Sequence, residues 1–151
     1  MIGVRSSLAA LLLCTASSVY AADHGAQKLV GIWYGSHVDS EVAAMPLHWK
    51  LWRQSDGRFV IDYYVQAGCY LSYSHRELGR WDVQRGVYRA ITQQIGDQQL
   101  GAIDKGYLQR FKISAQSGER MRLKQKGAAT EILLTRIPAE FNMETMNLCP
   151  E

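Results

Sequence analysis

A chain of 151 residues, 47% hydrophobic and 21% charged, has the size and composition of one ordinary globular domain. Its formal net charge of +3 is too small to suggest nucleic acid as a partner. No stretch after the N-terminus approaches the ~18 apolar residues of a membrane-spanning helix, so we expect no transmembrane segment.

The first 21 residues have the layout of a secretory signal peptide. Arg5 supplies a positive charge, an apolar run extends from Leu8 to Leu13, and the small residue Ala21 marks the expected cleavage site. We therefore expect a soluble mature chain of about 130 residues that is periplasmic or secreted. Residues 22–28 would form a flexible N-terminal tail.

From residue 29 onward, apolar and polar side chains alternate in short runs, as in β-strands with one buried face. The clearest pair joins 46–53 to 58–66 through the hairpin turn Asp56-Gly57. Similar runs occupy 29–35, 69–73, 79–83, 87–92, 107–114, 119–126 and 130–137. The polar stretch 96–106 is the expected mobile loop.

About eight short strands in one domain predict an all-β barrel or sandwich. We expect a single eight-stranded antiparallel up-and-down barrel over 29–137, because eight strands close around an interior that side chains or one small ligand can fill. Pro138 ends the last strand, since proline cannot donate to a ladder. Residues 138–151 would form a short C-terminal helix or tail.

Cys69 and Cys149 are the cysteines of the expected mature chain. In an oxidising compartment such a pair is expected to be bridged, and closure of so long a loop suggests roughly 4 kcal/mol of stabilisation. The alternative is two free thiols, one buried and one in a frayed tail.

Gly31-Ile32-Trp33 lies in the first predicted strand, and Arg136 lies near the end of the last. With these residues the chain resembles the lipocalin-like (calycin) β-barrels, above all small exported bacterial proteins with a lipocalin-like domain. Further features similar to the bacterial group are Trp49 with Arg53, Asp56-Gly57 with Phe59, Gly79 with Trp81, and Tyr88 with Thr92.

The resemblance implies that Trp33 closes the barrel bottom and that Arg136 lies across its ring as a cation–π contact. It also implies a disulfide between a mid-barrel strand and the C-terminal tail, which Cys69 and Cys149 would form. The Thr-Asp-Tyr signature of typical lipocalins is absent, and the chain is short for a large cavity.

Several aromatic side chains and one arginine are expected to face the barrel interior and could line a mostly apolar pocket. These candidate ligand-binding residues are Trp49, Arg53, Tyr63, Tyr73, Trp81, Tyr88 and Tyr107. A packed core whose phenols find partners at the barrel mouth explains the aromatic residues equally well. Arg53 would either bind a carboxylate or phosphate head, or reach solvent or an acidic group at the mouth.

Basic residues are concentrated between 105 and 126 and alternate there with apolar ones, which predicts a basic outer face on one hairpin. They are Lys105, Arg110, Lys112, Arg120, Arg122, Lys124 and Lys126. Such a face could contact an anionic lipid or an acidic protein surface, or could be a solvated strand face that resists aggregation.

No pair of acids or nucleophile elbow is visible, and the histidines lack metal-ligand spacing. We therefore expect no enzyme, no catalytic residue and no cofactor. If cleavage follows Ala21, the new N-terminus Ala22-Asp23-His24 could surround Cu(II) or Ni(II) with nitrogen atoms in one plane, or could be a tail without function.

The sequence thus predicts an exported lipocalin-like barrel that binds a small hydrophobic or amphipathic molecule. The alternative is a barrel with a filled core that acts through its surface, as a protein-binding module or enzyme inhibitor. A cavity lined by Trp49, Arg53 and Tyr63 would favour the first hypothesis, and a solid core with an exposed apolar patch the second.

Overall fold

The computed structural model of the chain describes residues 24–37, 46–101, 107–125 and 131–149. The strands are β1 (Gly31–His37), β2 (Leu47–Arg53), β3 (Arg58–Ala67), β4 (Tyr70–Gln84), β5 (Val87–Ile95), β6 (Gln98–Gln99), β7 (Leu108–Gln116), β8 (Arg120–Gln125) and β9 (Glu131–Arg136). Within these ranges helix is limited to one turn, α1 (His24–Gln27), and a 3-10 turn at Met143–Thr145. No helix there is long and apolar enough to cross a membrane.

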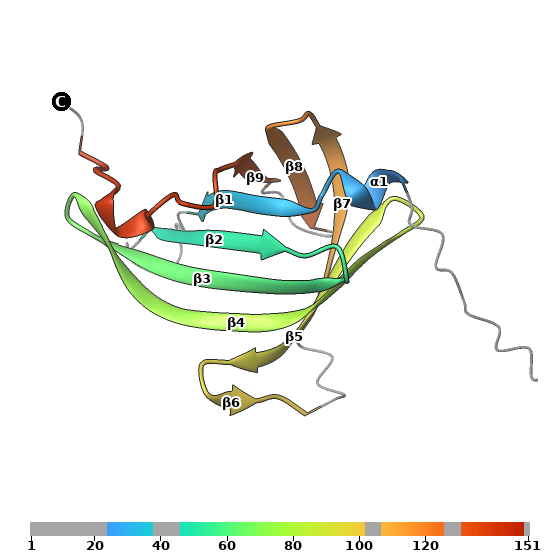
Figure 1. Cartoon of the computed structure of the whole chain (residues 1–151), viewed down its shortest axis with the longest axis horizontal. Coiled ribbons are helices and arrows are strands. Elements are labelled where there is room, and N and C mark those ends of the chain that lie inside the picture. The colour runs from blue at the N-terminus through green and yellow to red at the C-terminus, as the bar shows by residue number, and fades with distance from the viewer. Residues whose placement is uncertain (1–23, 38–45, 102–106, 126–130, 150–151) are drawn as a thin grey trace, which may run out of the picture.

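The strands form a closed barrel (Figure 1). Neighbours pair in the order β4-β3-β2-β1-β9-β8-β7-β5, and the pairing of β4 with β5 closes this ring of eight strands. All pairings are antiparallel, and β6 adds a short extra strand against the end of β5. The predicted fold class, an all-β eight-stranded antiparallel up-and-down barrel, is confirmed.

One strand differs from its predicted form. Residues 69–73 and 79–83 were expected as separate runs, yet β4 is continuous over 15 residues and pairs with β3 and β5 along most of its length. A β-bulge lies where the register with β4 shifts between Tyr63 and Tyr64 of β3, and its extra residue is Ser74 of β4, which has no partner there. An extra residue in a ladder changes which side chains share a face, and this interrupts the alternation that the sequence shows there.

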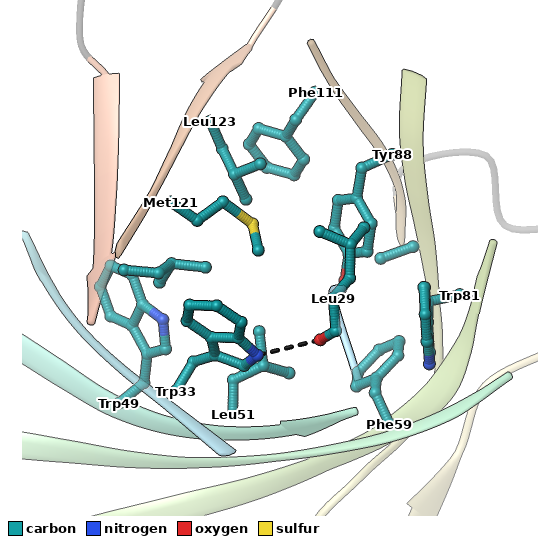
Figure 2. Close-up of a cluster of buried hydrophobic side chains, with 12 residues drawn as sticks. Leu29, Trp33, Trp49, Leu51, Phe59, Trp81, Tyr88, Phe111, Met121 and Leu123 are labelled. Carbon is teal, nitrogen blue, oxygen red and sulfur yellow. Dashed lines mark hydrogen bonds between the residues drawn. The ribbon is translucent and has the colours of Figure 1, made fainter. Parts of the chain in front are cut away.

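One end of the barrel is closed by the contact that the resemblance implied. Trp33 pairs with Arg136 across β1 and β9, is fully buried, and lies 4.4 Å from the Arg136 guanidinium carbon. Its indole Nε1 donates a hydrogen bond of 2.9 Å to the carbonyl oxygen of Leu29, as Figure 2 shows. Arg136 in turn donates to the carbonyl oxygens of Lys28 and Val30, at 3.0 Å each. The chain before β1 is thereby fastened over this end, which we call the floor.

The structure places a helical turn, α1, within the predicted N-terminal tail. Leu29 follows α1, has no exposed surface, and belongs to the main core. The signal peptide 1–21 and the first two residues of the metal-binding hypothesis, Ala22 and Asp23, lie outside the described residues.

The C-terminal segment packs on the outer face of the barrel, beside β1 to β4 (Figure 1). Lys50 of β2 donates to the carbonyl oxygens of Ala139 and Phe141, at 3.1 and 2.8 Å. Met143 is buried against Tyr64 and Leu71. The expected helix is only the 3-10 turn.

The expected disulfide is present. Cys69 in the β3–β4 turn is bonded to Cys149, with a Cα–Cα distance of 4.9 Å and a sequence separation of 80. The bond fastens the last described residue of the C-terminal segment to the barrel wall.

Candidate ligand cavity inside the barrel

A cavity of about 390 Å³ occupies the barrel interior between the floor and the opposite end of the strands. Its wall is mostly apolar. The lining residues are His37, Leu47, Trp49, Leu51, Arg53, Phe59, Ile61, Tyr63, Tyr88, Ala90, Thr92, Gln109, Phe111, Leu123, Gln125, Ile132 and Leu134. His37, Leu47 and Gln125 stand at strand ends away from the floor, so this end of the cavity is its mouth.

Small residues leave this interior partly empty. Gly35 of β1 pairs with Trp49 of β2, and a Cβ atom at position 35 would come within 2.4 Å of the indole ring. The missing side chain lets the indole lie against the β1 backbone. Ala90 of β5, which is also buried, presents only a methyl group to the cavity. Larger side chains at these positions would fill the space that the cavity occupies.

At and below the cavity, buried apolar side chains form the main core, which Figure 2 draws. Trp33 and Leu29 lie among the side chains at this end, and Trp81 packs beside Tyr88 with ring centroids 6.1 Å apart. The Trp81 indole Nε1 donates to the carbonyl oxygens of Gln54 and Arg58, at 3.1 and 3.0 Å. Trp81 is therefore a core residue with a satisfied donor and does not line the cavity.

Arg53 is the one residue of the lining that carries a permanent charge. It is the last residue of β2, pairs with Gly31 and Phe59 close to the floor, and has no exposed surface. Its guanidinium carbon lies 4.4 Å above the ring centroid of Tyr88, on β5. Its Nη1 is 3.9 Å from the sulfur of Met121, on β8. Both β5 and β8 are three strands from β2 around the ring, so the side chain reaches across the barrel.

The remaining donors of Arg53 have no partner among the described residues. Nε and Nη2 are both buried and make no hydrogen bond there. None of the ion pairs found in the described ranges includes Arg53. The expectation that this arginine reaches solvent or an acid at the mouth is therefore wrong for the described part of the chain.

A polar cluster lies on the wall formed by β3, β4 and β5. Tyr63 stacks on His75 with centroids 4.8 Å apart, and the Thr92 hydroxyl donates to Glu77 at 3.0 Å. Glu77 is also 3.6 Å from His75 Nε2. Burial, then the nearby Glu77 charge, raises the pKa of the Tyr63 phenol, so Tyr63 is a neutral donor at physiological pH.

Four of the seven candidate ligand-binding residues line the cavity together: Trp49, Arg53, Tyr63 and Tyr88. Trp81 belongs to the core beneath them. Tyr107 directly precedes β7 and is not part of the lining.

The predicted inward orientation of Tyr73 is wrong. Its side chain is 50% exposed and meets Tyr64 edge-on on the outer face, with ring centroids 5.8 Å apart. The bulge between Tyr63 and Tyr64 is the physical reason. It places Tyr64 opposite Tyr73, and Tyr63 opposite His75. Ser74 between them has no partner on β3, so Tyr73 faces outward while His75, stacked on Tyr63, faces the other way.

Sequence reasoning found Arg53 and Tyr63 but missed other polar residues in or beside the site. Thr92 shares a face with Tyr88 and Ala90 by strict alternation, so its position was available from the pattern of β5. Gln109 and Gln125 gave no such signal, because polar residues near strand ends are ordinarily solvated. Glu77, which is not in the lining but accepts from Thr92, shares its face with Gly79 and Trp81 by alternation along β4.

The basic outer face is present in the described part of the hairpin. Arg110, Lys112, Arg120, Arg122 and Lys124 are all exposed on β7 and β8. Lys105 and Lys126 lie outside the described residues.

No protein-family model matches this chain. No curated protein matches it closely enough to lend a function.

Proposed function

We propose that this protein is an exported, lipocalin-like binding protein, not an enzyme, and that it holds a small hydrophobic or amphipathic molecule inside its barrel. The observation that carries the proposal is the apolar cavity of about 390 Å³ above a solid floor. Sites for small molecules are typically concave and mostly apolar, with a few placed polar groups, and measure roughly 300–1,000 Å³. The cavity falls in that range and has such polar groups in Arg53, Tyr63 and Thr92.

Export to the periplasm or the exterior belongs to the same proposal. The Cys69–Cys149 bond supports it, because disulfides persist in oxidising compartments and are rare where thiols are kept reduced.

A surface function is the second candidate, and the basic face of β7 and β8 favours it. Exposed cations on one face attract anionic lipid or an acidic protein surface. Vesicle sedimentation tests this directly. Binding to vesicles of anionic lipid that disappears at high salt and in Arg122→Ser/Lys124→Ser would support it, and absence of binding at low salt would contradict it.

The interior site is tested by blocking it. Ala90→Phe places a large side chain in the cavity, and Ala115→Phe makes the same change at an exposed position of β7. N-phenyl-1-naphthylamine, a neutral dye that fluoresces in apolar surroundings, serves as the probe. The wild type and Ala115→Phe should bind one dye per chain, and Ala90→Phe should bind at least about 10-fold more weakly.

Circular dichroism and thermal melts show whether both variants are folded. If folded Ala90→Phe binds the dye as the wild type does, or if the wild type binds none, the interior is not the site. In a separate measurement, native mass spectrometry of the protein purified from its own host would identify any co-purified small molecule by its mass.

A further inference from the structure

We propose that Arg53 is the receptor for the head group of the ligand, and that the ligand is a small amphiphile carrying one carboxylate. It enters head first, with the carboxylate at the floor and the apolar tail toward the mouth. This inference rests on the proposed interior site and specifies its chemistry.

The positive charge of Arg53 is buried. An arginine with no exposed surface and no acidic partner in the described ranges is costly, because its charge has left water without compensation. Its contact with the face of Tyr88 offsets part of that cost, since a ring face attracts cations. An anion in the cavity would supply the missing countercharge.

Two nitrogen atoms of the Arg53 guanidinium, Nε and Nη2, are the donors without a partner among the described residues. Nη1 faces the Met121 sulfur, whereas Nε and Nη2 make no hydrogen bond to the described residues. Nε–H and one Nη2–H of a guanidinium point the same way, side by side, and together form the fork that accepts both oxygens of a carboxylate. The contacts among the described residues therefore leave this fork unoccupied.

The position of Arg53 determines the orientation that we propose for the ligand in the cavity. Its guanidinium lies above the solid core, while the mouth is bordered by His37 and Gln125. The wall between these levels is apolar and suits a hydrocarbon tail, with Leu47, Leu51, Ile61, Ile132 and Leu134 among its members. A ligand whose charge lay at the mouth would leave the Arg53 fork unsatisfied.

The acid that contacts the cavity lining, Glu77, is already engaged. Glu77 accepts from Thr92 and lies 3.6 Å from His75, on the wall of β3 to β5. It does not form an ion pair with Arg53.

A carboxylate suits the site better than a phosphate monoester. One fork and one positive charge match one carboxylate, whereas a phosphate dianion would bring a second charge and further acceptors into an apolar floor. Both head groups share the fork chemistry, so the test includes each of them.

The test uses four molecules with the same ten-carbon tail and different heads: decanoate, decan-1-ol, decyl phosphate and decyltrimethylammonium. Each is titrated against the wild-type protein loaded with N-phenyl-1-naphthylamine. Decanoate should displace the dye at a concentration about 10- to 100-fold below that of decan-1-ol, the range expected for hydrogen bonds to a buried charge. Decyl phosphate should be weaker than decanoate, and the cationic amphiphile weakest.

A substitution of Arg53 tests whether this residue causes the preference for decanoate over decan-1-ol. Arg53→Met keeps an unbranched side chain and removes the fork, and should lose the advantage of decanoate while still binding the dye and decan-1-ol. Arg110→Met removes the same charge from the outer wall and should behave as the wild type. The melting temperature of unliganded Arg53→Met should equal or exceed that of the wild type, because an uncompensated charge has been removed.

Failure of this inference is distinguishable from failure of the proposed function. If the dye and decan-1-ol bind but decanoate has no advantage, or keeps its advantage in Arg53→Met, the cavity is a binding site and Arg53 is not its anion receptor. If decyl phosphate binds more tightly than decanoate, the assignment of a carboxylate is wrong. Even if Arg53→Met fails to fold, the head-group series on the wild type decides whether the cavity prefers a carboxylate, and a cavity without that preference overturns the inference.

Discussion

At the scale of single residues, Gly31 and Trp33 act together at the closed end of the barrel. Gly31 has a backbone φ of +128°, which side chains with a Cβ rarely adopt, and a Cβ there would lie 2.3 Å from Nη1 of Arg136. The glycine thus permits both the bend before β1 and the close approach of the guanidinium. That approach places Arg136 over Trp33.

We expect Gly31→Ala to destabilise the protein by about 1–3 kcal/mol, since it combines a strained φ with a displaced arginine. Gly101→Ala is the control, because a Cβ at that position meets nothing within 4 Å. Urea unfolding followed by tryptophan fluorescence measures both. Equal stability of the two variants would contradict this explanation of the floor.

Trp33→Ala should lower the free energy of unfolding by about 3–5 kcal/mol, as a truncation in a fully buried site. Trp52→Ala removes the same side chain from a position that is 49% exposed, and should have a much smaller effect. If the two variants are equally stable in urea, Trp33 does not hold the floor.

At the scale of elements, the C-terminal segment makes a second, outer core. His48 of β2 points away from the cavity, yet is 6% exposed because this segment and its neighbours cover it. Its Nδ1 lies 2.8 Å from the Tyr34 hydroxyl, and its Nε2 has no partner in the described ranges. Burial is the main cause that lowers the pKa of His48, and the nearby Gln66 side chain opposes it in part.

Stability should therefore fall as the pH drops below about 6.5, the ordinary pKa of histidine. The unfolded chain binds a proton there that folded His48 does not bind, so acid favours unfolding until the lowered pKa is passed. Denaturant unfolding at a series of pH values measures this slope. It should shrink in His48→Gln and persist in His75→Gln, and an unchanged slope in His48→Gln would contradict the assignment.

The disulfide stabilises this same segment. Closing a loop of 80 positions suggests roughly 4 kcal/mol from chain entropy, as an upper-end value. The double variant Cys69→Ser/Cys149→Ser should unfold at correspondingly lower denaturant concentration. Intact mass after alkylation without reduction should show no modified cysteine at these positions, and two modified cysteines would contradict the bond.

The sequence predicted where the strands lie better than it predicted which side chains face the barrel interior. The β2–β3 hairpin was predicted correctly from the turn sequence Asp56-Gly57. In the structure, the Asp56 carboxylate accepts a hydrogen bond from the Arg58 backbone amide at 3.0 Å. The floor followed from the resemblance at Trp33 and Arg136. Tyr73 was assigned to the wrong face because a bulge depends on pairing between strands and leaves no clear local signal.

The cavity itself was beyond prediction from the pattern alone. Trp49, Tyr63 and Tyr88 were correctly placed inside, but inward aromatic residues fit a packed core equally well. What leaves the space is the combination of Gly35, Ala90 and their neighbours across the barrel, which only the tertiary structure brings together. The burial of His48 was hidden for the same reason, since alternation assigned it to the solvent face.

At the scale of the whole molecule, the parts of the barrel that stabilise the fold differ from the part that we propose binds the ligand. The floor, the outer core and the disulfide hold the fold, and the interior above the floor is left partly empty. A closed barrel also leaves few strand edges exposed to other chains. This division allows the buried Arg53, which has no acidic partner among the described residues, to persist, because the rest of the structure supplies the stability that the charge removes.

The most direct test is a crystal structure of the protein with 10-bromodecanoate. Anomalous scattering locates the bromine, and the electron density locates the carboxylate. We expect the carboxylate on Nε and Nη2 of Arg53 and the bromine near the mouth, between His37 and Gln125. A barrel filled by its own side chains, or a bromine at the floor with the carboxylate outside, would contradict the account.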